Sequence, residues 1–293
     1  MQPAPVSTSD HWTILSLIER TTTHLAENGI DDARLNTELL LSHVLAFSRL
    51  QLYTNYDRPI SDEELQRFKE LLRRRLKHEP LQYILGETEF MGFPLYVNHR
   101  VLIPRPETEL LVERVRDAIA GIGLANIDIL EIGTGSGNIS IALEKFVSNA
   151  SITSIDASEQ AQQVAQSNLK RNGASRITLL HANVFDDFLP GIAYDIIVSN
   201  PPYISRAEYD LLQPEIKEYE PRMATTDDAD GLTFIRRICE VAVGKLRPGG
   251  FVFIEIAHNQ SEAATRISTE AGLQYVTVFK DYDGHPRILS AQK

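Results

Sequence analysis

The sequence predicts a doubly wound α/β domain with a mostly parallel sheet, preceded by a small all-helical domain. Two observations lead to this fold class. From about residue 127 onward, short apolar runs alternate with helical stretches, as in sheets that helices cover on both faces. Before about residue 83, apolar residues recur only at helical spacing. We therefore expect a helical part at 1–78, a connector at 79–104 and an α/β part at 105–293.

The helical part is predicted to contain three long helices. Two of them are indicated by apolar residues at helical spacing, namely Leu15, Ile18 and Leu25, followed by Leu35, Leu39, Leu40 and Val44. A third helix should begin after Ser61, because Glu64 three residues later completes a capping box. From Glu79 to Asn98, prolines and glycines interrupt short β-like pieces such as Phe93–Val97, which predicts a β-hairpin in the connector.

The α/β part is predicted to contain short buried strands separated by helices and loops. The strands are expected at Ile127–Ile132, Ser151–Asp156, Ile177–His181, Tyr194–Ser199, Phe251–Ile256, Tyr275–Phe279 and 287–290. Helices are expected at about 138–147, 158–172 and 230–246, and from about 260. A polar, proline-rich loop should occupy 201–229, and the turn Asp281–Pro286 should close an antiparallel C-terminal hairpin.

Composition limits the classes of protein to which the chain can belong. Of its 293 residues, 43% are hydrophobic and 24% are charged, which is ordinary for a globular protein. No apolar run approaches the ~18 residues of a membrane span, and Met1–Asp10 is too polar for a secretory signal or an anchor. The single cysteine, Cys239, excludes an internal disulfide and a cysteine-based zinc cluster. We therefore expect a cytoplasmic protein.

The net charge of −11 argues against DNA as the substrate, because duplex-binding proteins gain most of their non-specific affinity from Lys and Arg. A local basic patch at Arg73-Arg74-Arg75 would be the exception. On the same predicted helix, Glu63, Glu64 and Glu70 interleave with these arginines, so we interpret it as a solvated face of mixed charge. The charge balance favours a protein or a small molecule as the substrate.

A glycine-rich turn follows the first predicted strand of the sheet. Gly133, Gly135 and Gly137 come shortly after Glu131 and before a predicted helix. Glycines let the backbone turn sharply and approach a ligand closely, and doubly wound sheets bind ligands at this edge. The spacing G-x-G-x-G differs from the dinucleotide fingerprint G-x-G-x-x-G and is similar to the first motif of class I methyltransferases. A purely structural turn is the alternative.

Three further positions fit a nucleoside cofactor. Asp156 ends the second predicted strand, about 20 residues after the turn, where a carboxylate can accept both hydroxyls of a ribose. NAD-binding proteins use the same device, so Asp156 alone leaves both cofactors open. Asn183 and Val184 follow the third strand, where class I methyltransferases often place a polar residue on the adenine amino group and an apolar one beside the ring. The sequence motifs of the common hydrolases are absent.

The fourth predicted strand ends directly in Asn200-Pro201-Pro202-Tyr203. The prolines fix φ, so that the Asn200 side-chain oxygen and the Pro201 carbonyl can converge as two acceptors on one –NH2 group. Tyr203 offers a flat face to a conjugated amide or base. Such a nitrogen is a poor nucleophile because its lone pair is delocalised, and two acceptors would favour the pyramidal form that can attack a methyl group. Good alignment can supply about 7–11 kcal/mol. A turn that merely ends the strand is the alternative.

Four segments, by their order and spacing, resemble the bacterial release factor glutamine methyltransferases (PrmC/HemK). They are Pro80–Gly86, Val101–Glu109, the glycine turn and Asn200–Tyr203, and the resemblance runs from about residue 11 to 290. It implies the class I methyltransferase fold and a methyl transfer from S-adenosyl-L-methionine, without a metal. The acceptor would be the side-chain amide nitrogen of the glutamine in the Gly-Gly-Gln loop of peptide chain release factors, and S-adenosyl-L-homocysteine would be the other product.

The resemblance also implies roles for individual residues. The cofactor would be bound by Glu131, Gly133, Thr134, Gly135, Ser136, Gly137, Asp156, Asn183, Val184 and Asn200. The glutamine would be bound by Asn200, Pro201, Pro202 and Tyr203, with Arg105 and Glu107 at the pocket mouth, and Asn200, Pro201 and Tyr203 would be catalytic. The chain departs from the commonest family pattern at Asn183, Val184 and Ala257. We expect a monomer whose helical part docks the release factor.

Three alternatives remain open at this point. The first is a DNA adenine methyltransferase, which would need to flip the base and hold the duplex with a basic surface. The second is a glutamine methyltransferase that acts on a ribosomal protein by the same chemistry. The third is a binding protein that retains the cofactor site without activity, against which the intact Asn-Pro-Pro-Tyr segment argues.

Overall fold

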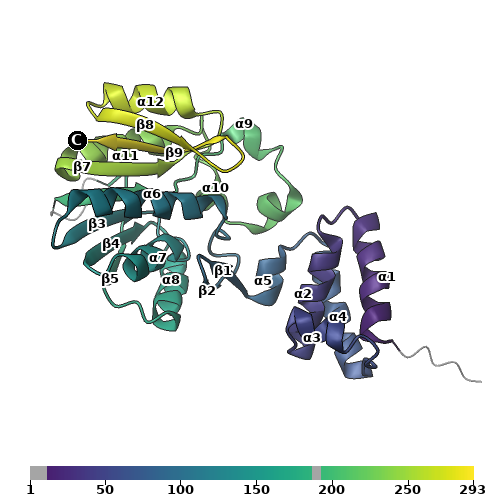
Figure 1. Ribbon diagram of the computed structural model, residues 1–293. Helices are drawn as coiled ribbons and strands as arrows, with labels where there is room; N and C mark the ends of the chain where they lie inside the picture. The colour runs from purple at the N-terminus through teal and green to yellow at the C-terminus, as the bar shows by residue number, and fades with distance from the viewer. Residues whose placement is uncertain (1–11, 187–192) are drawn as a thin grey trace, which may run out of the picture. The chain divides into compact units, whose positions relative to one another are not determined.

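The computed structural model describes residues 12–186 and 193–293, and the chain divides into two compact units. The first unit ends at Leu85, and the second begins at Gly86. Figure 1 shows that the first unit is built from helices, whereas the second contains a sheet with helices packed on it.

The first unit consists of α1 (Ile14–Glu27), α2 (Ala33–Leu45), α3 (Arg49–Thr54), α4 (Asp62–Arg75) and α5 (Leu81–Leu85). Their apolar faces meet in one core, which includes Leu17, Leu41 and Phe68. The predicted capping box is present at the start of α4. The backbone N–H of Glu64 donates to the Ser61 hydroxyl, and the backbone N–H of Ser61 donates to the Glu64 carboxylate.

The second unit begins with an antiparallel hairpin of β1 (Glu87–Phe90) and β2 (Phe93–Tyr96). Met91 and Gly92 between these strands have φ values of 51° and 83°, the positive values that a two-residue type I′ turn requires. The Asn168 amide of α8 (Glu159–Arg171) bonds both the backbone N–H and the carbonyl of Tyr96, at 2.7 and 2.9 Å. The hairpin is therefore fastened to the α/β core.

The large sheet confirms the predicted fold class. Its strand order is β5 (Ile177–His181), β4 (Ala150–Asp156), β3 (Ile127–Ile132), β6 (Tyr194–Ser199), β7 (Leu246–Glu255), β9 (Pro286–Gln292) and β8 (Gln274–Lys280). The strands from β5 to β7 pair in parallel, whereas β9 is antiparallel to both β7 and β8. The sheet is thus mostly parallel and ends in the predicted antiparallel C-terminal hairpin.

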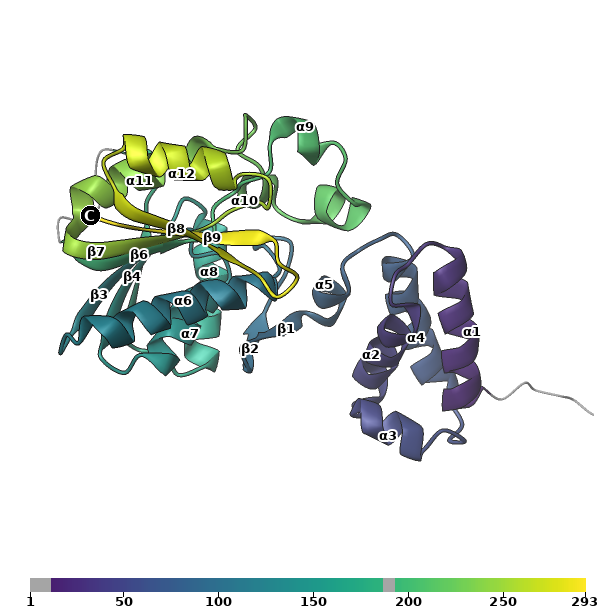
Figure 2. The ribbon, with the colours of Figure 1, turned by 45° about the horizontal axis from the view of Figure 1, so that its top comes forward.

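Helices cover both faces of this sheet (Figure 2). On one face, α6 (Glu107–Ile122), α7 (Asn138–Phe146) and α8 pack in a core with residues such as Ile129 and Ile196. On the other face, α11 (Thr233–Lys245) and α12 (Ser261–Glu270) pack in a second core with residues such as Leu130 and Ile197. Neighbouring residues on one strand thus enter opposite cores, which explains why the strands read as continuous apolar runs.

Three stretches differ from the expectation. The predicted connector begins with the helix α5, and two parts of the predicted α/β region contain helices that were not expected. No helix was expected between 105 and 127, yet α6 lies there, with Leu111, Val115 and Ile119 at four-residue spacing in its buried face and Gly123 at its end. The expected loop 201–229 contains α9 (Arg206–Tyr209), the single π-helical turn η1 (Glu215–Tyr219) and α10 (Arg222–Thr225). These elements are too short for a recognisable apolar period.

Candidate active site

The candidate site lies at the carboxyl edge of the sheet, where β3 has β4 on one side and β6 on the other. The register places Gly133, Asp156 and Asn200, which end or follow these strands, beside one another. The chain order reverses at this position, since β4 and β5 extend from β3 in one direction and β6 and β7 in the other. Doubly wound sheets bind ligands at such a point.

The glycine turn has the backbone conformation that its residues suggest. Gly133, Gly135 and Gly137 have φ values of 87°, 53° and 82°, which a residue with a Cβ rarely adopts. A Cβ at Gly137 would also lie 3.3 Å from the Cδ1 atom of Leu169, so the third glycine lets α7 pack closely on α8. The Asn168 amide donates to the Ser136 carbonyl at 2.9 Å and fixes the turn from the same helix.

The turn and the Asn-Pro-Pro segment line one cavity of about 440 Å³, a size that suits a small molecule. The predicted site residues in its wall are Arg105, Gly133, Thr134, Gly135, Ser136, Asp156, Asn183, Val184, Asn200, Pro201 and Pro202. Four other predicted residues lie outside the lining. They are Glu107, Glu131, Gly137 and Tyr203. The structure therefore brings most of the predicted residues together around one space.

Asp156 is held by the backbone on both carboxylate oxygens. The N–H of Gly135 donates to Oδ2 at 2.9 Å, and the N–H of Ser158 donates to Oδ1 at 2.8 Å. Burial raises the pKa of Asp156 above its ordinary value, and these two hydrogen bonds oppose that shift. Because each oxygen has a second lone pair, the carboxylate can still accept hydroxyl groups from the cavity.

Glu131 lies beneath the turn rather than in the cavity wall. It is fully buried, and one of its oxygens accepts hydrogen bonds from Ser140 and from Ser154, the latter at 2.5 Å. Its other oxygen, Oε1, has no hydrogen-bond partner among the described residues. Burial raises the pKa of Glu131 to about 7. The contacts therefore link Glu131 to the strands and α7 that carry the turn.

The part of the cavity wall that is formed by Val184, Phe185 and Phe234 is apolar and partly aromatic. Val184 is buried, and Phe185 stacks edge-on against Phe234 with ring centroids 5.1 Å apart. The Asn183 side-chain oxygen accepts a hydrogen bond from the backbone N–H of Phe185 at 3.1 Å. The Arg237 guanidinium donates to the Val184 carbonyl at 2.8 Å and holds this segment in place.

The Asn200 side chain is oriented by a neighbour from another part of the chain. Its Nδ2 atom donates to the hydroxyl of Thr108 on α6 at 3.0 Å. The Asn200 backbone carbonyl lies 3.8 Å from where a Cβ of Gly133 would be, so the glycine turn and the Asn-Pro-Pro segment approach closely. This contact brings the proposed cofactor and substrate sides of the cavity together.

A buried carboxyl group at the end of β7 joins these residues. The Thr108 hydroxyl donates to Glu255 Oε2 at 2.7 Å, and the Tyr203 hydroxyl donates to Oε1 at 3.2 Å. Burial raises the pKa of Glu255 to about 7, while the bonds from Thr108 and Tyr203 and the charge of Arg287 oppose this shift. Burial also raises the pKa of Tyr203, so its hydroxyl stays protonated and can donate. Tyr203 therefore faces Glu255 rather than lining the cavity.

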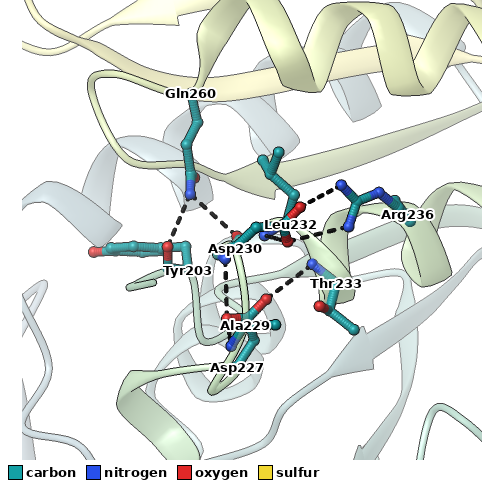
Figure 3. Close-up of polar contacts among 9 residues, drawn as sticks. Tyr203, Asp227, Ala229, Asp230, Leu232, Thr233, Arg236 and Gln260 are labelled. Atoms are coloured by element: carbon teal, nitrogen blue, oxygen red, sulfur yellow. Dashed lines mark hydrogen bonds and ion pairs between the residues drawn. The ribbon is translucent and has the colours of Figure 1, made fainter. Parts of the chain in front are cut away.

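The Tyr203 backbone is held by a second network, which Figure 3 shows. The Gln260 amide, just before α12, donates to the carbonyls of Tyr203 at 2.8 Å and Gly231 at 3.1 Å. A Cβ at Gly231 would lie 2.5 Å from the Tyr203 carbonyl, so only glycine fits there. Asp227 accepts backbone N–H bonds from Ala229, Gly231 and Thr233 and shapes the loop that carries Gly231.

Of the two residues predicted at the pocket mouth, Arg105 lines the cavity and Glu107 does not. Arg105 lines the cavity, but its guanidinium donates to both carboxylate oxygens of the buried Glu220, at 2.8 and 2.7 Å. This ion pair fastens the segment before α6 to the 215–225 region. Glu107 is exposed and lies outside the lining.

Several residues of the site were missed from the sequence. They are Glu255 and Gln260 in the networks, and His99, Phe185, Met223, Asp227 and Phe234 in the cavity wall. Thr108 belongs to the segment that carries the resemblance and lines the cavity, but its bonds to Asn200 and Glu255 were not predicted. One signal could have found Glu255, because a carboxylate at the end of a buried apolar strand lies at the ligand-binding edge. Phe185 directly follows the predicted Val184 and could also have been expected, whereas Gln260 depends on a contact with a residue 57 positions away.

Metal-ligand clusters and membrane-spanning helices are both absent from the part of the chain that the structure describes. Within 12–186 and 193–293, no group of three or more His, Cys, Asp or Glu side chains is arranged to hold a metal ion. In the same part of the chain, no helix is long and apolar enough to cross a membrane.

Comparison with known proteins identifies the family. Residues 16–86 match the family model of the PrmC N-terminal domain, and residues 106–219 match that of the methyltransferase small domain. The chain is 41% identical over 285 residues to the release factor glutamine methyltransferase of Geobacter sulfurreducens, which covers 96% of this chain and 97% of that protein. It is 40% identical over 287 residues to the release factor glutamine methyltransferase of Chlorobaculum tepidum, and this match covers 95% of this chain and 97% of that protein.

The fold comparison agrees with this. A crystal structure of a methyltransferase from Pyrococcus furiosus superimposes with a TM-score of 0.51 at 21% identity, over 69% of this chain and 90% of that one. At this identity, the match concerns the fold alone. The sequence relatives decide the family: the chain belongs to the release factor glutamine methyltransferases and is an enzyme of that family.

Proposed function

We propose that this enzyme transfers a methyl group from S-adenosyl-L-methionine to the side-chain amide nitrogen of the glutamine in the Gly-Gly-Gln loop of peptide chain release factors. The observation that carries the proposal is that Asn200, Pro201 and Pro202 line the same cavity as the glycine turn and Asp156. An amide held by the first group would lie beside a methyl donor held by the second. The names of the relatives support the release factor as the substrate.

The glycine-turn end of the cavity fits S-adenosyl-L-methionine by its chemistry. Asp156 would accept the ribose hydroxyls, since its carboxylate keeps lone pairs beside its two backbone bonds. Val184 and Phe185 would provide apolar contacts for the adenine. The bound cofactor supplies an activated methyl group and leaves as S-adenosyl-L-homocysteine. The proposal includes no metal.

The segment Asn200–Tyr203, which we call the clamp, contributes Asn200, Pro201 and Pro202 to the other end of the cavity. The clamp would hold and orient the glutamine amide. Asn200 Oδ1 and the Pro201 carbonyl would accept its two N–H groups, which favours the pyramidal nitrogen and directs its lone pair at the methyl carbon. The new N–C bond forms as the S–CH3 bond of the cofactor breaks, and the nitrogen gives up one proton to solvent. Such acceptors stabilise the positive charge that develops on nitrogen, and alignment removes much of the entropic barrier.

We assign docking of the release factor to residues 1–78, with 79–104 as a connector and 105–293 as the catalytic part, in a cytoplasmic monomer. The match of residues 16–86 to the family model of the PrmC N-terminal domain supports that role. A comparison of substrates tests it. We expect kcat/KM for the intact release factor to exceed that for a short Gly-Gly-Gln peptide by more than ~10-fold, because the peptide lacks the docking contacts. Equal values would show that docking contributes nothing.

The substrate itself is tested by offering several acceptors at once. The enzyme is incubated with isotopically labelled cofactor and a release factor, ribosomal proteins or plasmid DNA, and label is located by mass spectrometry. We expect label in the release factor alone. Label in DNA adenine or only in a ribosomal protein would support one of the two other methyltransferase interpretations instead. A reaction without enzyme is the control. For the comparisons of variants below, the matched control is Ser268→Ala, which alters a buried hydroxyl of α12 outside the cavity lining.

A further inference from the structure

A chain of buried hydrogen bonds connects the clamp to groups that have no place in the proposed methyl transfer. Asn200 Nδ2 donates to the Thr108 oxygen at 3.0 Å, and the Thr108 hydroxyl donates to Glu255 at 2.7 Å. The second oxygen of Glu255 accepts the hydroxyl of Tyr203 at 3.2 Å. Thr108 and Glu255 are each only 1% exposed. The groups come from α6, from β7 and from the segment after β6, so their meeting is a product of the fold.

The direction of these bonds follows from the groups themselves. When Glu255 is ionised, its carboxylate only accepts hydrogen bonds, so the single hydroxyl proton of Thr108 then points at Glu255. The Thr108 oxygen then offers only lone pairs to Asn200. Asn200 must therefore turn its –NH2 group toward Thr108, which leaves Oδ1 on the opposite side as an acceptor.

This orientation decides whether the clamp can work. The two ends of an asparagine amide have almost the same size and shape, so packing alone distinguishes them poorly. If the amide were reversed, Asn200 would present –NH2 to the –NH2 group of the glutamine, and two donors would face each other. Only the orientation that Thr108 imposes presents the acceptor that the proposed reaction needs.

We propose that Thr108 and Glu255 are positioning residues that fix the Asn200 amide with its oxygen toward the substrate nitrogen. The inference deepens the proposed function and rests on it. Glu255 also receives the hydroxyl of Tyr203, so one buried carboxylate aligns both the acceptor and the ring of the Asn-Pro-Pro-Tyr segment. Neither Thr108 nor Glu255 needs to touch the reacting atoms for this role.

A pair of substitutions at Thr108 tests the proposal. Thr108→Val removes the hydroxyl and keeps the shape, whereas Thr108→Ser keeps the hydroxyl. With saturating release factor and cofactor, we expect Thr108→Val to lower kcat at least ~10-fold, because correctly aimed polar groups each contribute on the order of 10²–10³ in rate. Cofactor affinity should stay within about twofold of wild type, since Asp156 and the glycine turn are untouched. Thr108→Ser should restore most of kcat, and Ser268→Ala should leave it unchanged.

Three outcomes would overturn the proposal. They are a wild-type kcat in Thr108→Val, a folded Thr108→Ser that is as slow as Thr108→Val, and a loss of cofactor affinity that accounts for the whole effect. If Thr108→Val does not fold, Glu255→Gln carries the test. The glutamine side chain can offer Thr108 either a donor or an acceptor, so the orientation of Asn200 would no longer be fixed. We therefore expect kcat to fall while cofactor affinity is kept. An unchanged kcat would contradict the proposal. Failure of the proposed function looks different, because the wild-type enzyme itself would then leave the release factor unmethylated.

Discussion

The two ends of the cavity are held in place by different means. At the glycine-turn end, backbone groups form most of the structure: the N–H groups of Gly133 and Thr134 donate to the Ile155 carbonyl, and that of Gly135 donates to Asp156. At the clamp end, side chains from distant segments hold one another, with Thr108 bonded to Glu255 and Asn200. The comparison suggests that substitutions at the first end alter affinity for the cofactor, whereas those at the second end alter the rate of the chemical step.

The two buried carboxyl groups repeat this contrast. Glu131 and Glu255 are both buried at or near the end of a strand, and burial raises the pKa of each to about 7. Glu131 bonds to the hydroxyls of Ser140 and Ser154, which belong to the framework beneath the turn. Glu255 bonds to two residues that belong to or orient the clamp. Similar burial therefore serves packing in one case and alignment in the other.

The largest expected effect is at Asn200. In Asn200→Ala, the acceptor is lost, and we expect kcat to fall on the order of 10²–10³-fold, as for other oriented groups that stabilise a developing charge. Cofactor affinity should stay within a few-fold of wild type. Single-turnover rates with labelled cofactor and equilibrium binding check the two halves of the statement. Full activity in this variant would remove the basis of the clamp.

The pH dependence of stability reports on Glu255 when the wild type is compared with a variant that lacks this carboxyl group. Because its folded-state pKa of about 7 exceeds the ordinary value of 4.5, its contribution to stability is complete below that ordinary value. It is lost as the pH rises through about 7, by an amount on the order of 3 kcal/mol. The groups that face Glu255 are Thr108 and Glu107 on α6, Tyr203 and Arg287.

Urea denaturation of the wild type and of Glu255→Gln at pH 5 and pH 8 measures this difference. We expect the free energy of unfolding of the wild type to decrease, relative to the variant, on going to pH 8. A constant difference between the two proteins would mean that the carboxyl group is not perturbed. Asp281→Asn is a suitable control, because the pKa of Asp281 is lowered rather than raised.

A substitution at the other end of the cavity should affect affinity instead. Asp156→Ala removes the acceptor for the ribose hydroxyls, and hydrogen bonds to a charged group contribute about 1.5–3 kcal/mol. We therefore expect the dissociation constant of the cofactor to rise roughly 10–100-fold. At saturating cofactor, kcat should change much less. A large loss of kcat without a loss of affinity would contradict the division between the two ends.

The smallest of the expected effects concerns Gly231. Its φ is +81°, and a Cβ would lie 2.5 Å from the Tyr203 carbonyl, so Gly231→Ala should cost about 1–3 kcal/mol of stability. The displaced Tyr203 should also lower kcat with little change in cofactor affinity. Thermal unfolding and steady-state kinetics measure these effects. Gly244→Ala is the matched control, because no atom lies within 4 Å of a Cβ there.

The same contrast explains which parts could be predicted from the sequence. The parallel strands, the glycine turn and the Asn-Pro-Pro-Tyr segment depend on residues that are contiguous, so their patterns are visible in the chain itself. Asp156 was predicted because a strand end has a fixed place in this fold. The placement of both sides in one cavity then followed from the sheet topology.

The remaining features depend on contacts between distant residues. Thr108 and Glu255 are 147 positions apart, and Arg105 and Glu220 are 115 apart, so no local pattern announces either pair. Arg105 is an example. It was predicted to lie at the mouth of the pocket, but its ion pair with the buried Glu220 could not be predicted from the sequence. Glu131 was expected beside the cofactor, whereas in the structure it lies outside the cavity lining.

The most direct test of the whole account is site-resolved mass spectrometry of a release factor after reaction with the wild-type enzyme and with Asn200→Ala. We expect one methyl group on the side-chain amide of the Gly-Gly-Gln glutamine with the wild type, and almost none with the variant. A methyl group at another residue, or equal modification by both enzymes, would contradict it.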